Sequence, residues 1–150
     1  MSNVAKTRHL PDTSLNVVNR NAGTIPKNKI VGVGTPTGNE FAIDSLHAAG
    51  ASAAIGSISE DVETGKSTTL HGPGSIEAIE SDGSGTIASG AEVIAVAGAS
   101  LAAGGRVKTL PASTGTYYVV GRSVSPGTIA AVAGDLCLVR LCEPRKIIVA

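Results

Sequence analysis

The sequence predicts an all-β protein: a small β-barrel or a jelly-roll-like sandwich of short strands, preceded by an extended N-terminal arm. The first observation behind this prediction is a repeated turn motif, in which an apolar residue stands three positions before a glycine. Most copies resume a β-branched or apolar run within three positions of that glycine. Glycine adopts positive φ without steric cost, so such a turn lets the chain reverse into a new strand. The motif centres on Gly65, Gly90, Gly104 and Gly134.

A composition poor in large side chains is the second observation. Phe41, Tyr117 and Tyr118 are the only aromatic residues among 150, and there is no Trp. Ala, Val and Ile must therefore fill the core, which suits thin layers and close strand packing. Such a core buries less surface per residue, so we expect the monomer to be marginally stable. Packing against copies of itself or against a larger partner would compensate.

The third observation is a series of short strand patterns interrupted by turn signals. Residues 29–34 are expected to form one strand and residues 40–46 the next, with Phe41 and Ile43 facing inward. The Ala-rich segment 48–54 is expected to form one helical turn, because a glycine inside it argues against a longer helix.

The remaining strand patterns lie roughly 8–15 residues apart, as is typical of a barrel or a sandwich. The glycine turns recur at unequal steps of 25, 14 and 30 residues, which excludes a solenoid or a propeller. These strands are expected at residues 54–58, 67–70, 75–79, 92–97, 106–110, 116–124, 128–132 and 136–141.

The charge distribution divides the chain into a basic arm, residues 1–28, and a β-barrel or sandwich domain, residues 29–150. The arm has no helical or strand period over a useful length, so it is expected to be extended and to become ordered on contact. The first 29 residues carry five basic side chains against one acid, whereas residues 30–135 carry ten acids against four bases. This asymmetry favours a docking device, and a solvated, disordered N-terminus is the alternative interpretation. Nucleic-acid binding is not expected, because the arm has no aromatic residue to stack on bases.

One segment has the ending of a phosphate-binding loop, Gly-Lys-Ser-Thr at residues 65–68. Such a loop needs a second glycine five positions earlier, and Glu60 stands there. Asp61 and Glu63 would repel a nucleotide, and no strong helix pattern follows. We therefore expect no nucleotide cofactor.

Metal, disulfide and membrane signals are weak throughout the sequence. None of His9, His47 and His71 lies at metal-ligand spacing from another histidine or from a cysteine. Cys137 and Cys142 fall on one expected strand, roughly 17 Å apart, too far for a disulfide. Both are expected to be small buried hydrophobic residues of a protein assembled in a reducing cytoplasm. No signal peptide and no apolar run of ~20 residues is found, so no membrane partner is expected.

Several motifs follow one another between Ile30 and Glu143 in an order that resembles a known family. They are Lys-Ile-Val-Gly-Val-Gly at 29–34, Ile-Gly-Ser-Ile-Ser-Glu-Asp-Val-Glu-Thr-Gly at 55–65, Ile-Ala-Ser-Gly-Ala-Glu-Val at 87–93, Val-Val-Gly-Arg-Ser-Val at 119–124 and Ala-Gly-Asp-Leu-Cys-Leu-Val at 133–139. The series resembles the tailed-bacteriophage capsid cement (decoration) proteins, small Gly/Ala/Val-rich β proteins of the outer head surface.

The resemblance implies a structural virion protein without catalytic residues. It implies a homotrimer, or another oligomer, on the outer capsid surface, assembled in the host cytoplasm and bound to the major capsid (coat) protein. There it would stabilise contacts between coat-protein capsomers. We expect the basic arm to make the contact with acidic patches on the coat through Arg8, Arg20, Lys27 and Lys29.

Two other classes of function stay open. One is a carbohydrate- or receptor-binding β module exposed on a virion, in which Tyr117 or Tyr118 stacks on the ligand. Alternation along a strand places these two side chains on opposite faces, so only one of them could stack. The other class is a small β-barrel enzyme that uses a convergent pair of Asp or Glu side chains.

Overall fold

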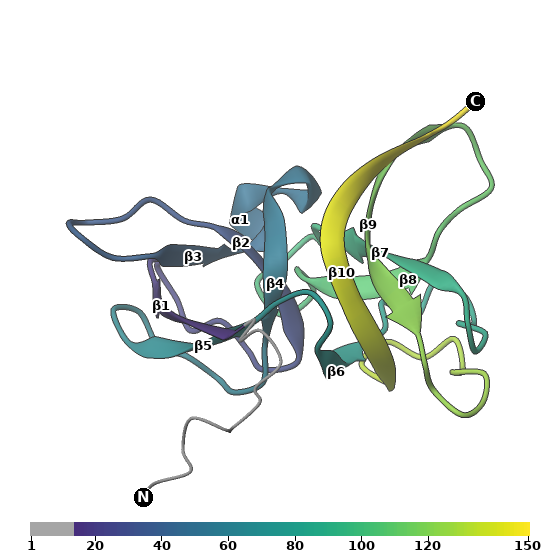
Figure 1. Ribbon diagram of the computed structural model, residues 1–150, viewed down its shortest axis with the longest axis horizontal. Coiled ribbons are helices and arrows are strands. Elements are labelled where there is room, and N and C mark those ends of the chain that lie inside the picture. The colour runs from purple at the N-terminus through teal and green to yellow at the C-terminus, as the bar shows by residue number, and fades with distance from the viewer. Residues whose placement is uncertain (1–13) are drawn as a thin grey trace, which may run out of the picture.

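The computed structural model describes residues 14–150 and contains two five-stranded β units, a closed barrel and a curled sheet (Figure 1). The only helical segments within this range are one short α-helix and one 3-10 turn. The predicted all-β fold with a small barrel is therefore confirmed.

The barrel has the strand order β1-β3-β2-β4-β5 and closes by pairing β5 with β1. β1 is parallel to β3, and the other pairs are antiparallel. Its elements are β1 (Ser14–Asn19), β2 (Lys29–Val33), β3 (Ala42–Ser45), α1 (Leu46–Ala49), the 3-10 turn Ala51–Ala53, β4 (Ala54–Ile58) and β5 (Ser67–His71).

The second unit is an antiparallel sheet with the order β6-β10-β9-β7-β8. It curls until a bridge between Ser81 and Val107 joins its two edges. β10 is the long curved ribbon in Figure 1, and a bulge between Leu141 and Arg145 interrupts its pairing with β9. The strands are β6 (Ile76–Glu80), β7 (Glu92–Val96), β8 (Arg106–Thr109), β9 (Gly115–Ser123) and β10 (Leu136–Val149).

The two units are joined by strand β2, which is buried on both faces. Val31 packs inside the barrel, whereas its neighbour Ile30 packs with Leu46 into the core of the curled sheet. This alternation is what a strand between two apolar layers requires. The barrel core consists of Val17, Ile25, Val31, Ile43, Ile58, Val62 and Leu70.

The glycine turns have the backbone conformation that the sequence predicted. Gly65, Gly90 and Gly134 have φ between 79° and 93°, and β5, β7 and β10 begin two residues after them. In the remaining copy, Gly105 rather than Gly104 adopts positive φ, and β8 follows directly. Gly105 lies against β2, where the Ile30 amide donates to its carbonyl oxygen at 2.8 Å. This turn therefore attaches the curled sheet to the barrel.

The expected arm is wrong for residues 14–28, which are part of the barrel. β1 pairs with β5 from Ser14 to Val18, and Val17 and Ile25 are buried in the core. The expected domain boundary at residue 29 thus falls inside a closed barrel. The pattern was missed because β1 has only one fully buried apolar side chain. The remainder of the expected arm, residues 1–13, lies outside the described residues.

Three smaller expectations also need correction. Residues 128–132 form no strand, and only Ile129 makes a bridge, to Ile87. Phe41 comes directly before β3 and is 65% exposed, whereas Ile43 faces the core as expected. β10 continues to Val149, beyond the expected end at residue 141, because the bulge lets it resume pairing with β9.

Candidate functional site

The basic residues expected to contact a capsid do not gather on one surface. Arg8 lies outside the described residues. Lys29 is only 2% exposed, so its side chain cannot reach a partner, and this part of the expectation is wrong. Its ammonium group instead pairs with Glu80, which also accepts a hydrogen bond from Arg106 Nε at 3.0 Å. Burial lowers the pKa of Lys29, and the hydrogen bond to Glu80 opposes that shift.

This Lys29–Glu80–Arg106 cluster links β2 of the barrel to β6 and β8 of the curled sheet. A buried ion pair gains little net stability over a well-packed apolar contact, but losing one partner leaves an uncompensated charge. The cluster therefore holds the two units in one arrangement and is structural.

Arg20 also forms an ion pair within the chain, with Glu40. Its Nε and second guanidinium nitrogen each donate to a Glu40 carboxylate oxygen at 2.6 Å. The hydrogen bond from Arg20 lowers the pKa of Glu40. Lys27, in contrast, is exposed, and its side chain makes no ion pair with any residue from 14 to 150. Of the expected contacts that can be examined, Lys27 alone presents an uncommitted charge.

The segment that resembled a phosphate-binding loop has another role. Gly65 forms a turn that leads into strand β5, whereas a phosphate-binding loop leads into a helix.

His71 Nε2 lies 3.3 Å from Ser59 Oγ and 3.8 Å from Glu77 Oε1, a grouping that the sequence did not indicate. Both partners meet the same ring nitrogen, whereas a catalytic triad needs the acid and the serine on different nitrogens. This group therefore lacks triad geometry.

The two tyrosines lie in different surroundings, as alternation along β9 predicted. Tyr117 is held by the 113–117 loop, where its hydroxyl lies 2.9 Å from Ser113 Oγ. Tyr118 lines a groove of about 510 Å³ between the barrel and the curled sheet. The groove also includes Pro73, Pro144 and Lys146.

A second groove, of about 380 Å³, is lined by residues of the barrel and is almost entirely apolar. Two of its lining residues are mostly exposed: Phe41 with 65% of its surface and Val33 with 57%. The side chain of Phe41, the largest apolar side chain of the sequence, is therefore mostly exposed at an apolar groove. We call this surface the barrel groove; it is lined by Leu15, Val17, Val33, Gly34, Pro36, Glu40, Phe41, Ala42, Ile55 and Leu70.

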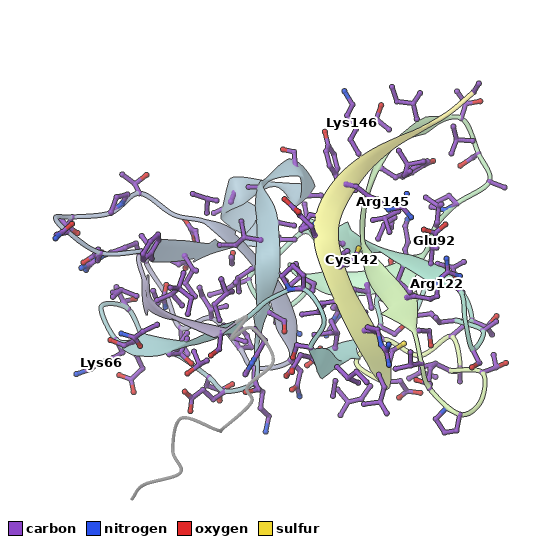
Figure 2. All side chains as sticks on the ribbon, in the orientation of Figure 1. Lys66, Glu92, Arg122, Cys142, Arg145 and Lys146 are labelled. Atoms are coloured by element: carbon purple, nitrogen blue, oxygen red, sulfur yellow. The ribbon has the colours of Figure 1, made fainter. Side chains whose placement is uncertain are left out.

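A third surface lies over the β10 bulge and is rich in arginine. A pocket of about 250 Å³ is lined by Arg122, Arg140 and Arg145, with Glu92 as its single acid. Figure 2 shows Glu92, Arg122 and Arg145 gathered beside β10, and Cys142 at the bulge. Partial burial raises the pKa of the Cys142 thiol, and neither cysteine forms a disulfide. We call this surface the arginine pocket.

Comparisons with protein-family models, with curated proteins and with solved structures found no match to this chain. Within residues 14–150, no group of three or more His, Cys, Asp and Glu side chains is arranged to hold a metal ion. In the same part of the chain, no helix has the length and apolar character of a membrane span.

Proposed function

We propose that this chain is a structural protein of a phage head, which binds the outer capsid surface as an oligomer and stabilises contacts between capsomers. The observation that best supports this role is the barrel groove, which Phe41 helps to line. In a protein with a core of Val, Ile, Leu and Ala, the largest apolar side chain is left mostly exposed by the described residues, 14–150.

The barrel groove suits contact between copies of this chain. The exposed Phe41 ring and the apolar depression belong to one patch, so the patches of two copies can pack against each other in an isologous contact, in which each Phe41 ring enters the groove of the other copy. Burial of apolar surface in this contact would stabilise each copy by roughly 25 cal/mol per Å². This stabilisation would add to that of a core built from small side chains.

An oligomer on a repetitive shell binds by avidity, because each attached copy raises the effective concentration of its neighbours. The affinity of a single contact can then be weak while occupancy of the shell stays high.

Co-sedimentation with purified empty heads of the phage that encodes this chain tests the proposal. The wild-type protein is expected to pellet with heads at a fixed, saturating copy number. Phe41→Ser should become monomeric and lose most of its occupancy, because avidity is lost. Ile148→Ser is the matched control, since Ile148 is 70% exposed but lies on β10, away from the groove. No saturable binding of wild-type protein would exclude the proposed function.

A carbohydrate-binding module is the second candidate, favoured by Tyr118 in the inter-unit groove. An aromatic ring beside Lys146 and Glu143 offers a stacking surface with polar partners for hydroxyl groups. A glycan array distinguishes this function: Tyr118→Ala should abolish any glycan signal, whereas Tyr117→Ala should retain it.

A further inference from the structure

The arginine pocket owes its composition to strand register. On the curled sheet, Glu92 of β7 lies directly opposite Arg122 of β9, and Arg122 lies directly opposite Arg140 of β10. The β10 bulge then brings Arg145 back to the same place, where it pairs with Glu92. Three arginines from two strands therefore line one pocket, and two of their guanidinium groups approach the Glu92 carboxylate.

The charges of this pocket are not balanced within the chain. Arg145 forms an ion pair with Glu92. Arg122 donates a hydrogen bond to the Gly90 carbonyl oxygen at 2.7 Å, and its guanidinium group lies 4.0 Å from the Glu92 carboxylate. Arg140 is exposed and makes no hydrogen bond or ion pair within the part of the chain described here. Like charges directly opposite each other on neighbouring strands destabilise a sheet. The pocket thus holds an excess of two positive charges that an anion would neutralise.

The shape and floor of the pocket limit the kind of anion. Its floor is formed by Val119, Gly121 and Leu141, which are apolar. Gly121 allows β9 and β10 to approach closely, because a Cβ there would lie 2.4 Å from the Arg140 carbonyl oxygen. A volume of about 250 Å³ holds a short side chain with a charged end.

We propose that the arginine pocket binds a carboxylate side chain from an acidic peptide segment of a partner protein. Guanidinium groups match a carboxylate by paired hydrogen bonds, and Arg140 has its donors uncommitted. The apolar floor suits the methylene groups of Glu or Asp, and the carboxylate of Glu92 disfavours the higher charge of a phosphate. A nucleic acid fits poorly, because residues 14–150 carry ten basic and eleven acidic side chains. Naming the coat protein as the partner rests on the proposed function; the carboxylate site does not.

The test is direct binding of a fluorescein-labelled Glu–Ser repeat peptide to the full chain at low salt, followed by fluorescence anisotropy. Its Gln–Ser counterpart, inorganic phosphate and an oligothymidylate serve as competitors. The Glu–Ser peptide should bind, and neither the Gln–Ser peptide nor phosphate at equal concentration should displace it. Absence of binding, or stronger competition by phosphate or by the oligothymidylate, overturns the proposal.

Matched charge variants locate the site. Arg140→Gln should weaken peptide binding by at least roughly tenfold, because it removes the uncommitted guanidinium. Lys66→Gln removes the same charge from the far end of the barrel (Figure 2) and should leave binding unchanged. Glu92→Gln should tighten binding, because it frees Arg145 and removes the internal competitor. Equal losses in Arg140→Gln and Lys66→Gln would show non-specific attraction and overturn the site.

The peptide assay contains no capsid, so its outcome is separate from that of the proposed function. If the peptide binds in the pocket but the chain does not bind heads, the carboxylate site stands and the capsid role falls. If the chain binds heads with unchanged occupancy in Arg140→Gln, the capsid role stands and the pocket is not the coat contact.

Discussion

The two β units of this protein differ in how they are closed and in what they leave exposed. The barrel pairs its first and last strands and carries the apolar groove that Phe41 helps to line. The two edges of the curled sheet are joined by the bridge between Ser81 and Val107 and by the Glu80–Arg106 ion pair, and its outer face carries the arginine pocket. An apolar face suits contact with a copy of the same chain, whereas a positive pocket suits an acidic partner. We therefore propose two separate interfaces, one on each unit.

The largest expected effect comes from the turn that joins the units. A Cβ at Gly105 would lie 2.2 Å from the Ile30 carbonyl oxygen, whereas a Cβ at Gly90 would meet nothing within 4 Å. Gly105 and Gly90 have φ of 87° and 85°, so an alanine causes the same backbone strain at either position. We expect Gly90→Ala to lower the free energy of unfolding by about 1 kcal/mol and Gly105→Ala by about 3 kcal/mol.

Urea unfolding of both variants measures this difference. Equal losses would mean that the close approach of the turn to β2 does not hold the curled sheet against the barrel. Two separate transitions in Gly105→Ala would sharpen the comparison, because each unit would then unfold by itself.

The next effect concerns the ion cluster between the units. Glu80→Gln leaves the buried ammonium of Lys29 without its carboxylate, and we expect a loss of about 2 kcal/mol, since Glu80 is partly exposed. Lys29→Met should cost less, because Met retains the apolar stem and Glu80 keeps Arg106. Thermal and urea unfolding of both variants checks this order. A larger loss in Lys29→Met would contradict our account of the cluster.

A smaller effect of opposite sign is expected on the sheet surface. Without any ligand, Arg140→Gln should raise the free energy of unfolding by a few tenths of a kcal/mol, since it removes the like charge opposite Arg122. Lys66→Gln should leave stability unchanged. A loss of stability in Arg140→Gln would mean that the three arginines are already compensated within the chain.

The smallest effect is a pH dependence on the barrel. The pKa of Glu40 is lowered from 4.5 in the folded protein, so its pairing with Arg20 stabilises the fold above that pH. The stabilisation is lost as pH falls through the lowered pKa. In Arg20→Gln, the free energy of unfolding should therefore fall less steeply below pH 4.5. An unchanged slope would mean that this surface pair adds no stability, as for many exposed ion pairs.

The sequence predicted most of the strands because glycine positions and β-branched runs are local signals. Gly65, Gly90 and Gly134 each required positive φ, and a strand followed each of them. β1 escaped prediction because its burial comes from a distant partner, β5, and not from its own alternation. Closure of the barrel depends on pairing between strands that are far apart in the sequence, which local patterns do not indicate.

The interaction surfaces were harder to predict than the fold. Lys29 looked like part of a basic arm, and only the packing of β2 between two layers reveals its burial. Phe41 was expected inside because apolar residues usually are, yet it precedes β3 and faces solvent. Arg122, Arg140 and Arg145 come together through register and a bulge, neither of which a single sequence discloses.

The central claim is that the barrel groove joins copies of this chain while the arginine pocket holds the partner. Sedimentation velocity combined with occupancy on purified heads tests it in one experiment with two variants. We predict that Phe41→Ser sediments as a monomer, whereas Arg140→Gln remains an oligomer of wild-type size that no longer binds heads. A wild-type chain that is monomeric, or an Arg140→Gln oligomer that decorates heads fully, would contradict the account.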